Sequence, residues 1–255
     1  MVNGPQNHFR SAYAGAIDRA EVDAGLRAYM LRVYNYMATG LAISGLIAWV
    51  IANVPAVTQV FYTPIGYTMS GNVAYSPTAL GMIGMFAPLG VLLIASFAGR
   101  NWSAGTTQAM YWLFVALQGV SLSILLFAYT GESVVRVFFI TAAAFGGLSL
   151  YGYTTKRNLS AMGSFLIMGL IGLLVAAVVN MFLASSMLSF VISAAGVLIF
   201  SGLIAYDTQR IKDAYVAGFG SREMETKAAV WSALALYINF INLLQFLLMI
   251  LGNRQ

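Results

Sequence analysis

Long apolar stretches separated by short polar ones run along almost the whole chain. Each stretch has about 20 residues, the length that a helix needs to cross the ~30 Å hydrocarbon core of a membrane. Backbone groups in lipid must hydrogen-bond within the protein, and unbroken apolar runs do so as helices, not as barrel strands. The seven stretches are 31–53, 78–99, 108–130, 133–154, 162–183, 187–207 and 229–251. The pattern predicts an all-α membrane protein, a seven-transmembrane helix bundle.

The composition points the same way. Hydrophobic residues make up 60% of the chain and charged residues 8%, and the mean hydropathy is +0.81. A soluble domain has about 25% charged residues. The chain has no cysteine, which excludes disulfides, thiol catalysis and cysteine-ligated metal sites.

Polar loops and prolines mark the boundaries of the segments. The stretches 99–105 and 155–160 combine charge with small and helix-capping residues. The link 54–77 contains three prolines and several aromatic residues, and we expect it to lie at the membrane interface. Pro88 falls inside the second segment and should kink that helix.

The distribution of lysine and arginine predicts the orientation. With the N-terminus inside, eleven of the thirteen basic residues lie on the inner side, and only Arg136 and Arg254 lie outside. We therefore expect residues 1–30 to form a cytoplasmic N-terminal tail and residues 31–255 the transmembrane domain, in a plasma (inner) membrane. The net charge of +5 then reports topology, and no nucleic-acid partner is expected, because basic stripes with interleaved aromatic residues are missing. The inner residues are Arg10, Arg19, Arg27, Arg32, Arg100, Lys156, Arg157, Arg210, Lys212, Arg222 and Lys227.

Asp207 is the only acidic residue within the seven apolar segments. It ends a stretch without charge that begins at Asn158. An ionisable group at such depth costs at least a few kcal/mol to insert, so it usually marks a polar cavity or an ion path. The alternative is a carboxylate at the membrane boundary that only caps a helix, since Arg210 and Lys212 follow at once.

Missing residue types argue against catalysis. The single histidine is His8, near the N-terminus, so a Ser-His site within the bundle cannot form. A zinc hydrolase would need several His or carboxylate ligands, and only Asp207 is available in the segments. A retinal protein would need a lysine in mid-membrane, and the last segment has none. We expect no enzymatic activity and no cofactor.

Three runs of residues give the chain a resemblance to a known family. They are Gly152-Tyr-Thr-Thr-Lys-Arg-Asn-Leu-Ser160, the segment 203–212 with Tyr-Asp-Thr-Gln, and 235–244 with Phe-Ile-Asn-Leu. Together they resemble the bacterial branch of the Bax inhibitor-1 family, over residues 31–252. The resemblance implies a bundle whose last helix is central, and it implies that the protein mediates a pH-sensitive Ca²⁺ leak. It also implies, for some bacterial relatives, association with a membrane-anchored quality-control protease.

The resemblance implies a gate that this chain keeps only in part. In the calcium-leak members an Asp on the sixth helix pairs with an Asp on the seventh, and an Arg near the inner end of the second helix latches them. Asp207 occupies the first position and Arg100 is the candidate for the Arg, but Asn239 stands where the second Asp would be. Two neighbouring carboxylates cannot both ionise cheaply, and this lets such a pair sense pH. With Asn239 in place, we expect the pH sensing to be altered.

The residue types alone also suggest a cation site. The Asp207 carboxylate and the amide oxygens of Asn239 and Asn242 are hard ligands suited to Ca²⁺ or another small cation. Asn239 and Asn242 are three residues apart and share a face of a helix. The alternative for both is a hydrogen bond between helices, worth about 1 kcal/mol. Arg100 could equally be a plain positive-inside anchor.

Two functions therefore stay open. The first is a cation leak or channel with Asp207 near its cytoplasmic gate, and an uncharged, wide path would favour it. The second is a non-conducting regulator or chaperone that contacts a membrane protein partner through the N-terminal tail or a loop from Arg210 to Lys227. A tightly packed bundle without polar lining would favour the second.

Overall fold

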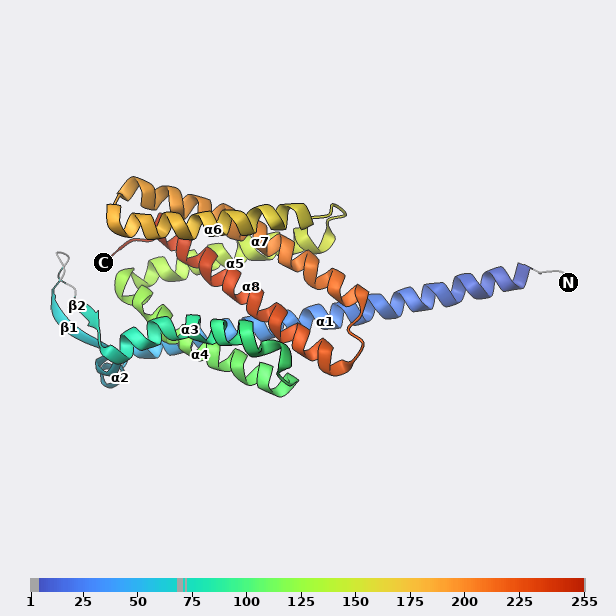
Figure 1. Cartoon of the computed structure of the whole chain (residues 1–255), viewed down its shortest axis with the longest axis horizontal. Helices are drawn as coiled ribbons and strands as arrows, with labels where there is room; N and C mark the ends of the chain where they lie inside the picture. The colour runs from blue at the N-terminus through green and yellow to red at the C-terminus, as the bar shows by residue number, and fades with distance from the viewer. Residues whose placement is uncertain (1–4, 68–70, 72, 255) are drawn as a thin grey trace.

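The structure is a computed structural model that describes residues 5–67, 71 and 73–254, with side chains described from residue 22 onward. Within the described part, seven helices are long and apolar enough to cross a membrane, which confirms the predicted number and order of spans. They form one elongated bundle (Figure 1). These helices are α1 (Pro5–Asn53), α3 (Ala79–Ala98), α4 (Ala104–Ala128), α5 (Gly131–Thr154), α6 (Ser160–Leu183), α7 (Ser186–Ala217) and α8 (Arg222–Leu251).

The last helix lies at the centre, as the family resemblance implied. α8 packs against α7, α1, α5 and α4, and 50% of its most apolar stretch is buried. The corresponding fraction for α6 is 11%, because that helix packs mainly on α7 and turns most of its surface outward. A polar group in the apolar stretch of α8 can therefore lie inside the bundle, as Asn239 does.

Glycines bring the helices around α7 and α8 close together. A Cβ on Gly152 of α5 would collide with the backbone of Ala205 in α7, and one on Gly196 of α7 would collide with the ring of Phe246 in α8. Small residues at such contacts let helix backbones approach closely. In lipid this matters because the hydrophobic effect does not drive helices together, and association depends on packing. This close packing fixes the height of α7 relative to α5 and α8.

The link between α1 and α3 forms a small folded cap at the end opposite the N-terminus (Figure 1). It contains α2 (Pro55–Phe61) and an antiparallel hairpin of β1 (Tyr62–Tyr67) and β2 (Val73–Pro77), in which Tyr62 faces Pro77. Tyr62 is buried, and its hydroxyl lies 2.9 Å from Ser123 Oγ in α4. The cap is thus anchored to the bundle.

The predicted loop from Arg210 to Lys227 was wrong. α7 continues to Ala217 and α8 already begins at Arg222, so only four residues connect them. The charged residues there extend the two helices beyond the apolar stretch. The reversal itself is made by Gly218 and Gly220, with φ of 83° and 71°, a conformation that favours glycine. Ser221 then caps α8 by accepting from the Met224 amide.

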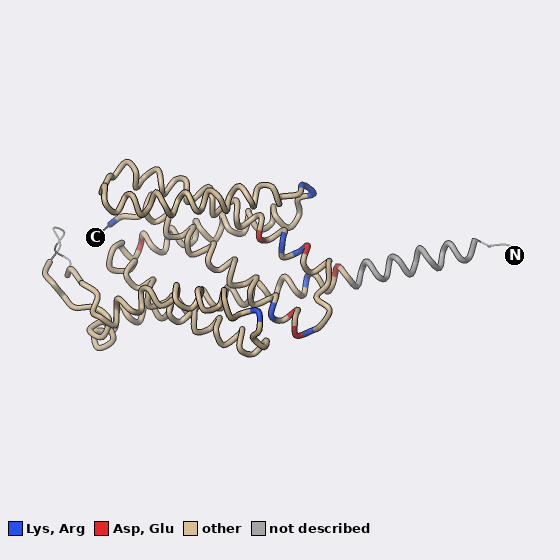
Figure 2. The backbone as a smooth tube through the Cα atoms, viewed as in Figure 1, with Lys and Arg blue, Asp and Glu red and all other residues tan. Residues whose placement is uncertain are grey.

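Most charged residues of the described part gather at one end of the bundle, and a few lie near the C-terminus at the other end (Figure 2). The N-terminal part of α1 projects beyond the other helices at the end where most charged residues gather (Figure 1). α1 passes residue 30 without a break, and Leu26, Tyr29 and Met30 are already buried in the core. The packed part of the chain thus begins before the expected tail boundary. We call this end the basic end.

Candidate ion site between α7 and α8

Asp207 lies on the inward face of α7 and is 8% exposed. Its Oδ2 accepts a hydrogen bond of 2.7 Å from Asn239 Nδ2 in α8. Its Oδ1 lies 2.8 Å from Arg210 Nη2, one helical turn further along α7. Both carboxylate oxygens are therefore engaged, and a buried charge without such partners would be costly.

Asn239 faces α7 from the central helix and is 6% exposed. A carboxylate only accepts hydrogen bonds, so the amide nitrogen of Asn239 must donate to it. The predicted neighbourhood of Asp207 and Asn239 is thus present in the structure. Its immediate effect is to join α7 to α8.

Arg210 is the site residue that our sequence reasoning missed. It was taken as an inner-side anchor, although the i,i+3 spacing from Asp207 was visible in the sequence. Its side chain is 55% exposed, and its guanidinium also lies 5.8 Å from the centre of the Tyr206 ring. Arg210 therefore connects the buried carboxylate with the basic end of the bundle.

Arg100 occupies a different place. It lies in the short helix η1 (Gly99–Asn101) between α3 and α4, and its backbone oxygen accepts a 3.3 Å hydrogen bond from Lys227 Nζ. Among the described residues, the ion pair of Asp207 is made by Arg210 and not by Arg100. The structure thus does not bring the candidate latch to the carboxylate.

Asn242 belongs to a second polar region on another side of α8. Its amide donates to the backbone oxygen of Ile238, 2.8 Å away in the same helix. It also lines a cavity of about 290 Å³ between α3, α4 and α8, together with Gln118, Ser121 and Gln245. The cavity abuts Pro88, so the proline that was expected to kink α3 lies at its wall. We call this space the α8 cavity.

A signal for the α8 cavity was present in the sequence. Gln118 and Ser121 are three residues apart on α4, and Asn242 and Gln245 are three apart on α8, so each pair shares one helix face. Polar residues in a membrane helix usually face the interior or a water-filled space. The spacing does not predict that the two pairs line the same cavity.

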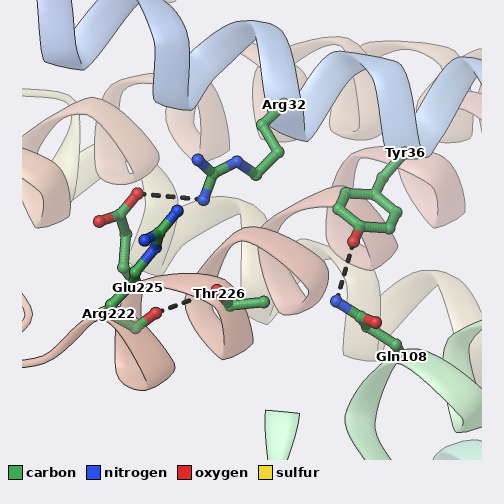
Figure 3. A network of polar contacts seen from close by, with 6 residues as sticks. All are labelled: Arg32, Tyr36, Gln108, Arg222, Glu225 and Thr226. Carbon is green, nitrogen blue, oxygen red and sulfur yellow. Dashed lines mark hydrogen bonds and ion pairs between the residues drawn. The ribbon is translucent and has the colours of Figure 1, made fainter. Parts of the chain in front are cut away.

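Polar contacts at the basic end hold α8 in place (Figure 3). Arg32 Nη1 of α1 lies 3.1 Å from Glu225 Oε1 in the first turn of α8. Nearby, Gln108 Nε2 of α4 donates to the Tyr36 hydroxyl of α1 at 3.0 Å. The beginning of α8 is therefore tied to α1, and α1 in turn is tied to α4.

Ca²⁺ takes six to eight oxygens, and the described residues contain no group of three or more His, Cys, Asp or Glu that could hold a metal. At Asp207 a cation would also have to displace Asn239 and Arg210. The chemistry suits a transient cation contact that competes with an internal ion pair.

Comparisons with known proteins place this geometry in context. The model of the family described as "Inhibitor of apoptosis-promoting Bax1" matches residues 26–255. A Caulobacter vibrioides protein is 51% identical, with 98% of this chain and 99% of that protein covered. The inner membrane protein YbhL of Escherichia coli K12 is 39% identical, with 91% and 94% covered. A Rickettsia prowazekii protein is 46% identical, with 91% and 92% covered.

Proposed function

This chain belongs to the Bax inhibitor-1 family and is a multi-pass membrane protein, and from that premise we propose that it mediates or regulates a cation leak. Ca²⁺ is the first candidate for the ion, because the polar groups near the central helix are hard oxygen ligands. The proposed function is non-catalytic and needs no cofactor. Its partners are the lipid membrane and the conducted cation.

The buried carboxylate at the α7–α8 contact carries this proposal. Asp207 is held by Asn239 and Arg210 near the basic end. The α8 cavity supplies polar groups from α4 and α8 on another side of the central helix. A packed bundle without polar lining was the feature expected of a non-conducting regulator, and the polar residues of the α8 cavity argue against it. In our proposal the contact of Asp207 with Asn239 and Arg210 is the closed gate, and release of α8 from α7 joins the two polar regions.

The test is cation flux into liposomes that contain the purified protein and a calcium dye. Asp207→Asn removes the charge and keeps the shape, so we expect flux to change several-fold while the protein still folds. Asp213→Asn is the matched control, because Asp213 lies on the same helix but is exposed. No flux from the wild type, or equal flux from wild type and Asp207→Asn, would contradict the proposal.

The proposed location is the inner membrane, with the N-terminus in the cytoplasm. The name of the YbhL relative supports the membrane, and the basic residues gathered at one end support the orientation (Figure 2). The chain has no cysteine, so single cysteines can report sidedness. In intact cells, Ser160→Cys and Ser221→Cys should be protected from impermeant thiol reagents and Ile65→Cys should react. Labelling of Ser221→Cys from outside would reverse the orientation.

The second candidate function is a non-conducting regulator that contacts a membrane protein, such as a membrane-anchored protease. The packing of α8 against α7, α1, α5 and α4 favours it, because a packed bundle was the feature expected of a non-conducting protein. The stretch from Arg210 to Lys227, the second contact surface that we had considered, lies at the ends of α7 and α8, where Asp213 and Glu223 are exposed. Absence of flux from folded protein in liposomes would favour this function.

A further inference from the structure

A groove between α1 and α5 is lined by residues of these two helices, and neither Asp207 nor the α8-cavity residue Asn242 forms part of its walls. It has a volume of about 500 Å³, within the 300–1,000 Å³ range of ligand pockets. Its walls are mainly apolar and aromatic, with Tyr34 on α1 and Phe145 on α5. α1 and α5 both pack on α8, and the groove is the space that they enclose with each other.

The groove is open toward the lipid. Leu31 and Leu150 form part of its walls, and they are 52% and 63% exposed. Both belong to helices long and apolar enough to span the membrane. An apolar chain can therefore enter from the side of the bundle without passing through water.

The length of the groove matches part of one leaflet. Its lining extends from Arg27 to Tyr34 along α1 and from Phe145 to Tyr153 along α5. At 1.5 Å per residue these stretches are on the order of 10 Å long. One leaflet contributes about half of the ~30 Å hydrocarbon core. The groove thus accommodates a segment of an acyl chain and does not cross the membrane.

Two cations lie at the end of the groove that faces the basic end. Arg27 lines it directly. Lys212 Nζ donates to the backbone oxygen of Tyr153 at 2.8 Å and lies 5.3 Å from the centre of that ring, which itself lines the groove. In the part of the chain that the structure describes, neither cation has an acidic partner within ion-pair distance. The site combines an apolar slot with unneutralised positive charge.

We propose that this groove binds an anionic phospholipid from the leaflet at the basic end. The acyl chain lies between α1 and α5, and the phosphate is bound by Arg27 and Lys212. Lys and Arg side chains near the membrane surface attract anionic headgroups. This inference does not depend on the proposed cation leak, because it concerns a different surface.

Two neighbouring glycines give a matched pair of variants. A Cβ on Gly146 or on Gly147 would meet no atom within 4 Å, so a larger side chain fits at either position. Gly146 lines the groove and Gly147 does not. Gly146→Leu should therefore fill the slot, and Gly147→Leu should leave it open. For the charge, Arg27→Gln is compared with Lys156→Gln, since Lys156 lies in the α5–α6 connection.

The experiment titrates phosphatidylglycerol onto the full chain in detergent and counts bound lipid by native mass spectrometry. We expect binding about tenfold weaker in Gly146→Leu and about fivefold weaker in Arg27→Gln, with both controls like the wild type. Phosphatidylcholine should bind more weakly than phosphatidylglycerol, and inorganic phosphate should not displace the lipid.

Three results would overturn the proposal. Equal phosphatidylglycerol binding in wild type, Gly146→Leu and Arg27→Gln would place the lipid elsewhere. Equal binding of phosphatidylcholine would remove the role of charge. Displacement by inorganic phosphate would indicate a simple anion site. If Gly146→Leu does not fold, Arg27→Gln against Lys156→Gln decides the question alone.

Discussion

The two polar regions around α8 use similar side chains but are closed to very different degrees. Asn239 is buried and bonded to Asp207 across the α7–α8 contact. Asn242, three residues further along, is half-buried, bonds within its own helix and lines a cavity of about 290 Å³. In the proposed leak the barrier would therefore be the contact at Asp207, because the space beside Asn242 is already a cavity.

The difference should appear in the energetics. A hydrogen bond to a charged group contributes about 1.5–3 kcal/mol, and the one from Asn239 joins two helices. The hydrogen bond of Asn242 joins a residue to the preceding turn of the same helix. It therefore adds little to the association of α8 with its neighbours.

The largest expected effect separates the two asparagines by stability. Asn239→Leu leaves Asp207 Oδ2 buried without its partner, and we expect the free energy of unfolding to fall by about 1–3 kcal/mol. Asn242→Leu removes only a bond within the helix, and we expect a loss below about 1 kcal/mol. Unfolding of both variants in mixed micelles measures the difference. Equal losses of unfolding free energy in the two variants would mean that Asn239 stabilises the protein no more than Asn242 does.

A second prediction concerns a variant that alters only the contact between Asp207 and Asn239. Asn239→Asp places a second carboxylate beside Asp207, and two such groups cannot both be ionised cheaply. We expect the pH at which cation flux changes to move toward neutrality relative to the wild type. Flux is measured in liposomes from about pH 5 to 8, with Asn242→Asp as the control in the α8 cavity. Superimposable profiles for Asn239→Asp and the wild type would show that this contact gates nothing.

Much of the fold could be predicted because membrane insertion depends on local composition. Apolar length gave all seven spans, and the segment 133–154 ends where α5 ends. The prediction failed where helices continue outside the apolar stretch, as in 210–217 and 222–228. There charged residues stand among apolar ones, and the turn glycines and the Ser221 cap mark the helix ends.

The candidate site was predictable only in part. Asp207 and Asn239 could be paired because each is a polar residue in an apolar helix and the family resemblance aligned them. The choice of Arg210 over Arg100 depends on which side chain reaches the carboxylate, and this follows from packing of α7 and not from spacing alone. That Gln118 and Gln245 line one cavity likewise depends on how α4 lies against α8.

The smallest expected effect concerns Arg210, the side chain that forms the ion pair with Asp207. Arg210 is 55% exposed, so its ion pair with Asp207 contributes at most about 1 kcal/mol. Arg210→Gln should therefore raise cation flux by no more than about fivefold, the change that ~1 kcal/mol gives. Arg100→Gln should conduct like the wild type, because the backbone oxygen of Arg100 makes its contact with Lys227 and the substitution keeps that atom. Both variants are measured in the same liposome assay. If Arg100→Gln raised the flux and Arg210→Gln did not, the latch expected from the family resemblance would hold the gate. The contact of Arg210 with Asp207 would then only screen the carboxylate charge, and Arg100 from η1 would hold the gate closed.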